Sequence, residues 1–406
     1  MPVVNRFQDI NPRRRRYAGR DVAKARTIDD LRFMACKRLP NFLYEYIEGG
    51  AEEEWTLRNN RAAFYRYRFL PHALRDVSKR STEHPIFAQP SALPLAIAPT
   101  GFAGFFWPEG DTMLARAAAA AGVPMVQSTV SNARVSEVAA TPGLRHWAQF
   151  YAWGGLGVQH ALLDRAEKAG SEALVVTVDG PLSGNREWDQ RSYAAPDQPT
   201  LATLLESARH PAWWLRMLAS RRMPNFENLV DLIGETNPSI FLVSKWINNN
   251  QNPALCWQDL ERLRARWPRK LVIKGLLRPE DAVRAADLGA DAVVLSNHGG
   301  RQAEPAASPL EMLPLVRAAV GDRLSLFLDS GVRRGSDIAI ALALGADAVL
   351  VGRATLYGLA AGGEPGVRRA LEILRTEFDR VLALVGVTSS SELDRNILLP
   401  LAAASG

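Results

Sequence analysis

The chain has 406 residues, of which 47% are hydrophobic and 23% are charged, the proportions of a globular protein rather than a disordered or collagen-like chain. Its two cysteines are too few for a disulfide framework or a cysteine-built metal site, so we expect no metal and a reducing cytosol. Much of the net charge of +6 lies in arginine runs at 13–16 and 221–222 rather than in a basic stripe. We therefore expect no nucleic-acid binding, and an anionic substrate or an anionic lipid surface explains the charge equally well.

The amino-terminal part predicts an arm followed by helices. Residues 1–26 are polar and basic, and we expect a flexible arm there. Apolar residues recur with a helical period between Thr27 and Glu48, and Pro40 is suited to start a second helix. We assign residues 27–90 to an N-terminal helical segment that packs on the rest of the chain.

Short apolar runs alternate with helical stretches beyond Pro94. Such alternation predicts a parallel sheet covered by helices, and eight units predict closure into a (β/α)8 TIM barrel over residues 91–386. The apolar runs are 95–98, 124–128, 147–151, 174–178, 271–274, 292–295, 324–328 and 348–351. About 90 residues separate the fourth and fifth runs, so we expect a long insertion after strand 4, with an inserted loop region at 190–250. Residues 387–406 would form a C-terminal tail.

A doubly wound open sheet is the alternative fold, but no Gly-x-Gly-x-x-Gly turn follows the first predicted strand. No uninterrupted apolar run reaches about 18 residues, so no segment is expected to span a bilayer.

All eight predicted strands end near polar or ionisable residues, where a barrel carries its active site. These positions are Pro99, Thr100 and Gly101; Ser128; Gln149 and Tyr151; Thr177 and Asp179; Lys274; Ser296 and His298; Asp329 and Ser330; and Gly352 and Arg353. A purely structural barrel would not need polar groups at every strand end.

The sequence Ser-Asn-His-Gly-Gly-Arg-Gln at 296–302 is the most informative motif. His298 is well placed as a base, and Arg301 has the planar fork that binds a carboxylate, so the loop suggests proton removal from an α-hydroxy acid. The alternative is a loop histidine that caps a helix beside a solvated arginine. Lys274 ends an apolar strand and should face negative charge, unless it reaches the surface.

The last two strand ends are typical of a phosphate site. Residues 329–335 and 352–353 follow strands seven and eight, where barrels commonly bind phosphate through backbone N–H groups. Because Arg301 already accounts for an anion on the substrate, these residues indicate a phosphorylated cofactor.

Together these motifs resemble the FMN-dependent L-2-hydroxy acid oxidases and dehydrogenases, a family that includes glycolate oxidase, lactate oxidase and mandelate dehydrogenase. The resemblance extends from about residue 27 to residue 386. It implies that His298 is the catalytic base, that Asp179 orients it, and that Tyr151 lies beside the substrate hydroxyl. Tyr46, Arg186 and Arg301 would bind the substrate carboxylate.

The resemblance also implies a set of FMN contacts. Lys274 would lie at the N1 and O2 edge of the flavin. The other implied contacts are Pro99, Thr100, Gly101, Ser128, Gln149, Thr177 and Ser296 for the ring, and Asp329, Ser330, Gly331, Arg333, Gly352 and Arg353 for the phosphate. Two departures from the family pattern are Ser330 in place of a common glycine and Ala303-Glu304 in place of Leu-Asp.

Several features resemble the mandelate dehydrogenase branch. Gly101 favours a dehydrogenase that passes electrons to a quinone, and the small Val130 favours mandelate or another aryl substrate over lactate. The apolar, tryptophan-containing segment at 204–222 predicts peripheral contact with the inner face of the cell membrane, the alternative being an amphipathic lid or oligomer contact. The family also implies a homotetramer. Alternative functions are an oxidase that reduces O2 to H2O2, and an FMN-dependent isomerase or non-redox phosphate-binding barrel.

Overall fold

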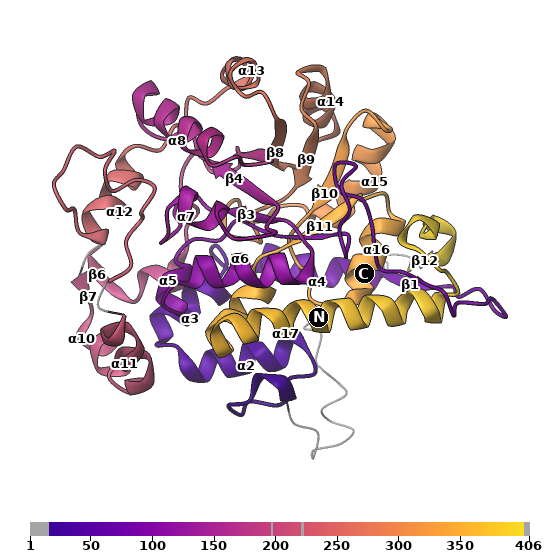
Figure 1. Cartoon of the computed structure of the whole chain (residues 1–406), viewed down its shortest axis with the longest axis horizontal. Helices are drawn as coiled ribbons and strands as arrows, with labels where there is room; N and C mark the ends of the chain where they lie inside the picture. The colour runs from indigo at the N-terminus through magenta and orange to yellow at the C-terminus, as the bar shows by residue number, and fades with distance from the viewer. Residues whose placement is uncertain (1–15, 196–197, 221–222, 402–406) are drawn as a thin grey trace.

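The computed structural model describes residues 16–195, 198–220 and 223–401 (Figure 1). Most of the expected basic arm, residues 1–15, therefore lies outside the described residues, as do Arg221 and Arg222 at the end of the expected membrane segment.

Eight parallel strands form a closed barrel at the centre of the molecule, in the order β10-β11-β2-β3-β4-β5-β8-β9. They are β2 (Leu95–Ile97), β3 (Met125–Gln127), β4 (His146–Phe150), β5 (Ala173–Thr177), β8 (Lys270–Leu276), β9 (Ala292–Leu295), β10 (Ser325–Leu328) and β11 (Ala348–Val351). Each coincides with one of the eight apolar runs, because strands covered on both faces bury nearly every side chain. The TIM-barrel prediction is confirmed.

Helices surround the barrel and supply its outer layer. They are α5 (Ala103–Phe106), α6 (Gly110–Ala121), α7 (Val135–Ala139), α8 (Leu156–Lys168), α13 (Trp257–Arg266), α14 (Pro279–Asp287), α15 (Pro309–Val320), α16 (Gly335–Ala343) and α17 (Arg353–Val385). A proline opens both α14 and α15, where its missing N–H has no helical partner to lose. Gly122 ends α6 with a φ of +68°, a conformation that glycine adopts without strain.

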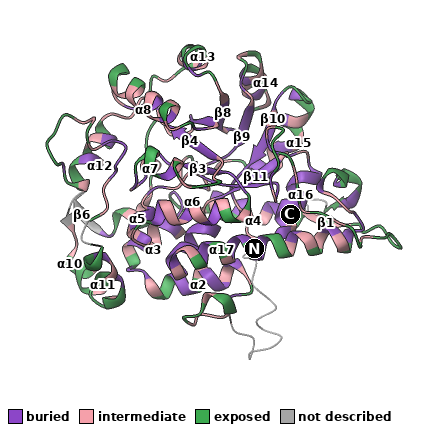
Figure 2. Cartoon of the chain, in the orientation of Figure 1, coloured by how far each residue is buried: buried purple, intermediate pink, exposed green. Residues whose placement is uncertain are grey.

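The interior of the barrel is closed by aromatic packing near the amino ends of the strands. The Trp147 and Phe327 rings lie 5.8 Å apart, and the Phe87 ring lies 5.2 Å and 5.4 Å from them. Lys270, the first residue of β8, places its ammonium 5.6 Å from the Phe87 ring. The barrel strands are mostly buried (Figure 2). Because the amino-terminal end of the barrel is filled with apolar side chains, the polar groups lie at the carboxyl ends of the strands.

The two ends of the chain pack together on one side of the barrel. Before the barrel lie η1 (Val22–Lys24), α2 (Ile28–Arg38), α3 (Asn41–Glu48), α4 (Trp55–Ala62), η2 (Ala63–Arg66) and β1 (Tyr67–Phe69). A capping box between Thr27 and Asp30 begins α2, which packs along α17 (Figure 1). The expected C-terminal tail contains η3 (Ser390–Glu392), η4 (Arg395–Ile397) and β12 (Leu398–Pro400), and β12 pairs with β1.

The insertion after the fourth barrel strand consists of short helices and a small sheet joined by loops. It contains α9 (Glu187–Gln190), the two-stranded sheet of β6 (Tyr193–Ala195) and β7 (Gln198–Pro199), α10 (Leu201–Ser207), α11 (Pro211–Ala219) and α12 (Ile240–Asn249). Thr200 and Ser239 cap α10 and α12 through their hydroxyl groups, a local signal that the sequence contains. None of the helices in the described ranges is both long enough and apolar enough to cross a membrane.

Candidate active site

The carboxyl ends of the barrel strands surround one cavity, and most of the predicted site residues line it. These are Tyr46, Pro99, Thr100, Gly101, Ser128, Gln149, Tyr151, Arg186, Lys274, His298, Arg301, Asp329, Ser330, Gly331, Arg333, Gly352 and Arg353. The remaining three, Thr177, Asp179 and Ser296, lie directly behind this lining and hydrogen-bond to Gln149, His298 and Lys274.

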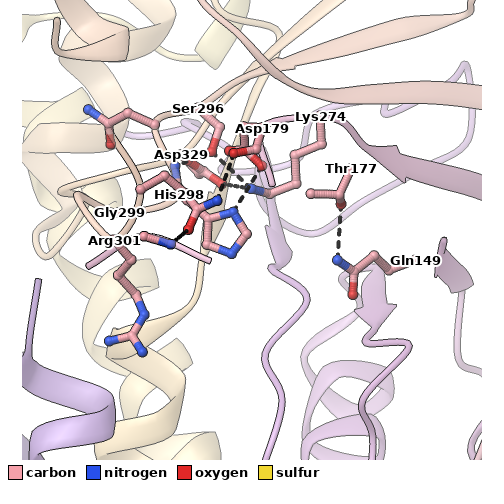
Figure 3. A network of polar contacts seen from close by, with 12 residues as sticks. Gln149, Thr177, Asp179, Lys274, Ser296, His298, Gly299, Arg301 and Asp329 are labelled. Carbon is pink, nitrogen blue, oxygen red and sulfur yellow. Dashed lines mark hydrogen bonds and ion pairs between the residues drawn. The ribbon is translucent and has the colours of Figure 1, made fainter. Parts of the chain in front are cut away.

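His298 follows β9 and is held by two contacts (Figure 3). Its Nδ1 lies 3.0 Å from Oδ1 of Asp179, and its backbone N–H donates to Oγ of Ser296 over 3.0 Å. Because Nδ1–H donates to the carboxylate, Nε2 is left with a free lone pair. Burial lowers the pKa of His298, although Asp179 opposes the shift. The neutral imidazole can therefore act as a base.

Asp179 is the ionised partner of this imidazole. Burial would raise the pKa of Asp179, but His298 and Lys274 outweigh it, and the pKa is lowered. Its Oδ2 is buried without a hydrogen-bond partner among the described residues. Gly275 allows the close approach of Asp179, since a Cβ at this position would lie 2.6 Å from the Asp179 Cβ and its φ is +111°.

Lys274 has the anionic partner that its burial requires. Its ammonium lies 2.9 Å from Oδ2 of Asp329 and 2.9 Å from Oγ of Ser296. Burial alone would lower the pKa of Lys274, but the carboxylates of Asp329 and Asp179 outweigh it and raise the pKa. The barrel mouth thus contains a permanent positive charge next to the imidazole (Figure 3).

Two arginines lie side by side at the rim of the cavity. Arg301 donates from Nη1 to the backbone oxygens of Tyr46 and Gly49, over 2.8 Å each, and from Nη2 to Asp189 over 3.1 Å. Arg186 donates from Nε to the Arg301 carbonyl over 3.3 Å. Burial and the neighbouring Arg301 lower the pKa of Arg186. An anion that enters here meets two guanidinium groups.

Sequence reasoning missed two residues that hold these arginines. Asp189 follows Arg186 by one helical turn and pairs with Arg301. Gln302 donates to the Asp179 and Leu182 carbonyls over 2.8 Å and 3.0 Å, and its Oε1 accepts from Arg186 over 3.3 Å. The position of Gln302 inside the 296–302 motif was the available signal, whereas nothing local marks Asp189.

The predicted phosphate end lies where β10 and β11 stop. Ser330 and Gly331 have φ values of +71° and +103°. The Ser330 hydroxyl donates to Asp329 over 2.7 Å and accepts from the Gly299 N–H over 3.0 Å, so this departure from a common glycine adds a link to the histidine loop. Arg353 donates to the carbonyls of Ile47, Gly299 and Gly49 over 2.7–2.8 Å, and burial lowers its pKa to about 10.

The other departure has a structural role outside the cavity. The Glu304 carboxylate accepts from the Thr56 N–H over 3.0 Å and so fixes the start of α4. Its charge is therefore used to position the N-terminal segment.

Comparison with known proteins identifies the family. The sequence profile of the FMN-dependent dehydrogenases matches residues 35–400. The chain belongs to this family. It is 41% identical to the (S)-mandelate dehydrogenase of Pseudomonas putida over 372 residues, 91% of this chain and 93% of that one. It is 40% identical to the L-lactate dehydrogenase of Caulobacter sp. (strain K31) over 369 residues, 91% of this chain and 97% of the relative.

Solved structures of the FMN-dependent dehydrogenase family agree with this assignment. The crystal structure of the monotopic membrane protein (S)-mandelate dehydrogenase superposes with a TM-score of 0.88 at 40% identity, covering 93% of this chain and all of the other. A mandelate oxidase superposes with a TM-score of 0.78 at 36% identity, covering 93% of this chain and 98% of the oxidase chain.

The cofactor of the family is FMN, and the residues present fit it. At one side of the cavity Gln149 is fixed by Ser128, Thr129 and Thr177, which leaves an oriented amide beside the cationic Lys274. Across the mouth, Arg333 and the backbone after β10 and β11 supply donors for a phosphate. This donor set combines a polar heterocycle site with an anion site, as FMN requires.

Proposed function

We propose that this member of the FMN-dependent dehydrogenases oxidises an L-2-hydroxy acid with an aromatic side chain to the corresponding 2-oxo acid. The observation that carries the proposal is that an imidazole oriented by a carboxylate and two guanidinium groups line the same cavity. His298 would take a proton from the hydroxyl group or from the α-carbon of the substrate, while Arg301 and Arg186 bind the carboxylate. Bound FMN supplies the two-electron oxidant.

The other residues of the cavity would bind the substrate or stabilise the charges that develop during the reaction. Tyr46, whose ring lies 4.9 Å from the Arg301 guanidinium, closes the carboxylate site, and Tyr151 faces the hydroxyl group. His298 takes up a proton at Nε2, and Asp179 stabilises the imidazolium that results. Lys274 would lie at the flavin edge and offset negative charge that develops there.

The aromatic side chain of the substrate is inferred from the walls of the cavity. Phe102, Val130, Trp153 and Phe226 line the cavity, and the Phe102 ring lies 4.6 Å from the Tyr46 ring and 5.0 Å from the Phe226 ring. The Trp153 ring stacks on Tyr151 with a 4.2 Å centroid separation and a 6° interplanar angle. A flat apolar wall of this kind gains more from burying an aryl ring than from burying a methyl group.

An anaerobic substrate screen tests the proposed reaction. The oxidised, yellow holoenzyme should lose its visible absorbance with L-mandelate, and more slowly with L-lactate, while the D-enantiomers leave it unchanged. A flavin that stays oxidised with every 2-hydroxy acid would contradict the proposal. In air, a stoichiometric yield of peroxide would assign the enzyme to the oxidases instead.

We propose a membrane quinone as the electron acceptor, with contact through the segment 204–222. Large apolar side chains are exposed on α10 and α11, namely those of Leu201, Leu204, Leu205, Leu215 and Leu218. Trp213 is buried and donates to the Phe105 carbonyl over 2.8 Å, which fixes α11 against α5. Such a helix with an apolar outer face fits the membrane interface.

Flotation with anionic lipid vesicles tests this contact. We expect the protein to float with the vesicles and a Leu215→Glu, Leu218→Glu variant to stay at the bottom with unchanged turnover of a soluble dye. Wild-type protein that remains with the soluble fraction would contradict the membrane proposal. The homotetramer and the cytoplasmic side of the membrane stay predictions, which light scattering and protease accessibility test.

A further inference from the structure

We propose that Asn132 is a positioning residue that sets the preference of the enzyme for aryl over small 2-hydroxy acids. Its side-chain amide holds two phenylalanines, Phe102 and Phe226, in the wall of the substrate cavity. This inference rests on the proposed function, and it assigns the selection of the substrate side chain to a residue that lies behind the cavity lining.

Both ends of the Asn132 amide have a partner. Its Oδ1 accepts from the Gly104 N–H over 2.9 Å, and its Nδ2 donates to the Asn225 carbonyl over 2.9 Å. A backbone N–H can only donate and a carbonyl can only accept, so these two partners fix the orientation of the amide. Asn132 therefore joins the loop after β3 to the segment after β2 and to the insertion.

The backbone at Asn132 is fixed as well, so the direction of its side chain is defined. Its N–H donates over 2.8 Å to Oδ2 of Asp111, which is almost fully buried in the first turn of α6. On the β3 side, Gln127 donates to the Ser131 hydroxyl and to the Ala133 carbonyl, over 2.9 Å each. The residues on both sides of Asn132 are thus anchored to the barrel.

Asn132 caps helix α5 from a different segment of the chain. Phe102 occupies the N-cap position of α5, and its side chain makes no capping hydrogen bond. The Gly104 N–H, one of the donors that a first helical turn leaves unpaired, is satisfied by Asn132 instead. Phe102 also has a φ of +63°, a strained conformation for a residue with a Cβ. The external cap holds the start of α5 and thereby the position of the Phe102 ring.

Phe226 is held by the other end of the same amide. Asn225, whose carbonyl accepts from Asn132, directly precedes Phe226, and its Oδ1 accepts from the Phe226 N–H over 2.8 Å. The Phe226 and Phe102 rings meet edge to face with their centroids 5.0 Å apart, and both residues line the cavity. One amide therefore positions both partners of an aromatic contact in the wall.

Loss of this amide should affect the side chain of the substrate rather than its reacting groups. The proposed base and the proposed carboxylate ligands, His298, Arg301 and Arg186, follow other strands and have their own hydrogen-bond partners. Without Asn132 the two phenylalanine rings are free to move apart, and an aryl group loses part of its wall. A methyl side chain buries less surface against the wall, so its binding depends less on the position of the rings.

Substrate discrimination by an Asn132→Ala holoenzyme tests the inference. We expect the ratio of kcat/KM for L-mandelate to kcat/KM for L-lactate to fall about 5-fold or more, the effect of losing roughly one neutral hydrogen bond. The change should lie in KM for L-mandelate, while kcat for both substrates and KM for L-lactate stay nearly unchanged. Equilibrium binding of benzoylformate and pyruvate, followed by the visible spectrum of the oxidised enzyme, should show the same selective loss without turnover.

Asn228→Ala is the matched control. The Asn228 side chain accepts from the Val135 N–H over 2.9 Å, so it also joins the stretch after β3 to the insertion. Asn228 is buried and is absent from the cavity lining, so this variant should lose a comparable hydrogen bond and keep the wild-type ratio. Asn132→Ser, whose shorter side chain cannot span the two partners, should repeat the effect if Asn132→Ala folds poorly.

Two outcomes would overturn the inference. One is a wild-type ratio in both Asn132 variants. The other is an equal loss for L-mandelate and L-lactate, which a residue with a merely structural role would give. Failure of the proposed function has a different signature, because the flavin of the wild-type enzyme would then stay oxidised with L-mandelate.

Discussion

Asp179→Asn removes the charge behind the proposed base with almost no change in size. The Nδ1 and Oδ1 atoms are 3.0 Å apart, and both side chains are largely buried. Two unit charges about 4 Å apart interact by about 4 kcal/mol at an effective dielectric constant of about 20. That energy stabilises the imidazolium form but not the neutral imidazole, so its loss should reduce kcat roughly 1000-fold.

The same substitution gives a pH prediction with a definite sign. His298 must be neutral to accept a proton, so kcat/KM should rise with pH through its pKa. Asp179 opposes the lowering of that pKa by burial. Removing the carboxylate leaves burial, Lys274 and Arg186 unopposed, which lowers the pKa of His298 further and moves the acid limb of the pH profile to lower pH, although the plateau rate falls.

Steady-state kinetics from pH 4 to pH 9 with L-mandelate measure both effects. Asp189→Asn is the matched control, because it neutralises a carboxylate on Arg301 rather than on the imidazole. It should raise KM and leave the acid limb in place. An Asp179→Asn enzyme with nearly normal turnover, or with its acid limb moved to higher pH, would refute the assigned pairing.

Three further substitutions test other parts of the site. Arg353→Ala should weaken FMN retention at least 10-fold, measured by fluorescence of released flavin, because it removes a cation and frees three backbone carbonyls. Gly101→Ala should lower turnover several-fold, since its Cβ would lie 2.6 Å from Cγ2 of Val130. Ser330→Gly should leave thermal stability within about 1 kcal/mol, because relief of a left-handed φ offsets the lost hydroxyl contacts with Asp329 and Gly299.

The barrel and the polar residues at its strand ends could be predicted from the sequence because both depend on local patterns. Buried parallel strands are continuous apolar runs, and a polar residue that ends such a run must lie at the mouth. Lys274 and His298 follow from this rule alone. The left-handed backbone at Ser330 is the counterpart of the glycine that the family commonly has there.

The support around the site could not be predicted because it is built from long-range hydrogen bonds to backbone atoms. Arg353 was expected at the phosphate, yet its three nitrogens donate to carbonyls of residues 47, 49 and 299. Every residue has a backbone carbonyl, so no sequence motif can identify which carbonyls accept these hydrogen bonds. A short interfacial helix was expected where α11 lies, but α10 and α12 were missed, since the long gap between strands concealed their capping residues Thr200 and Ser239.

Arg301 and Arg353 donate hydrogen bonds to the backbone carbonyls of residues 46, 47 and 49, and these bonds have a consequence for the synthesis of the protein. Tyr46 leaves the ribosome some 300 residues before Arg353, the residue that starts the last barrel helix. Helix α3 therefore lacks the hydrogen bonds from Arg301 and Arg353 until nearly the whole chain has been synthesised. The proposed carboxylate site is complete only after α3 and α17 have met, so we expect a nascent chain that stalls before α17 to be inactive even when most of its strands have paired.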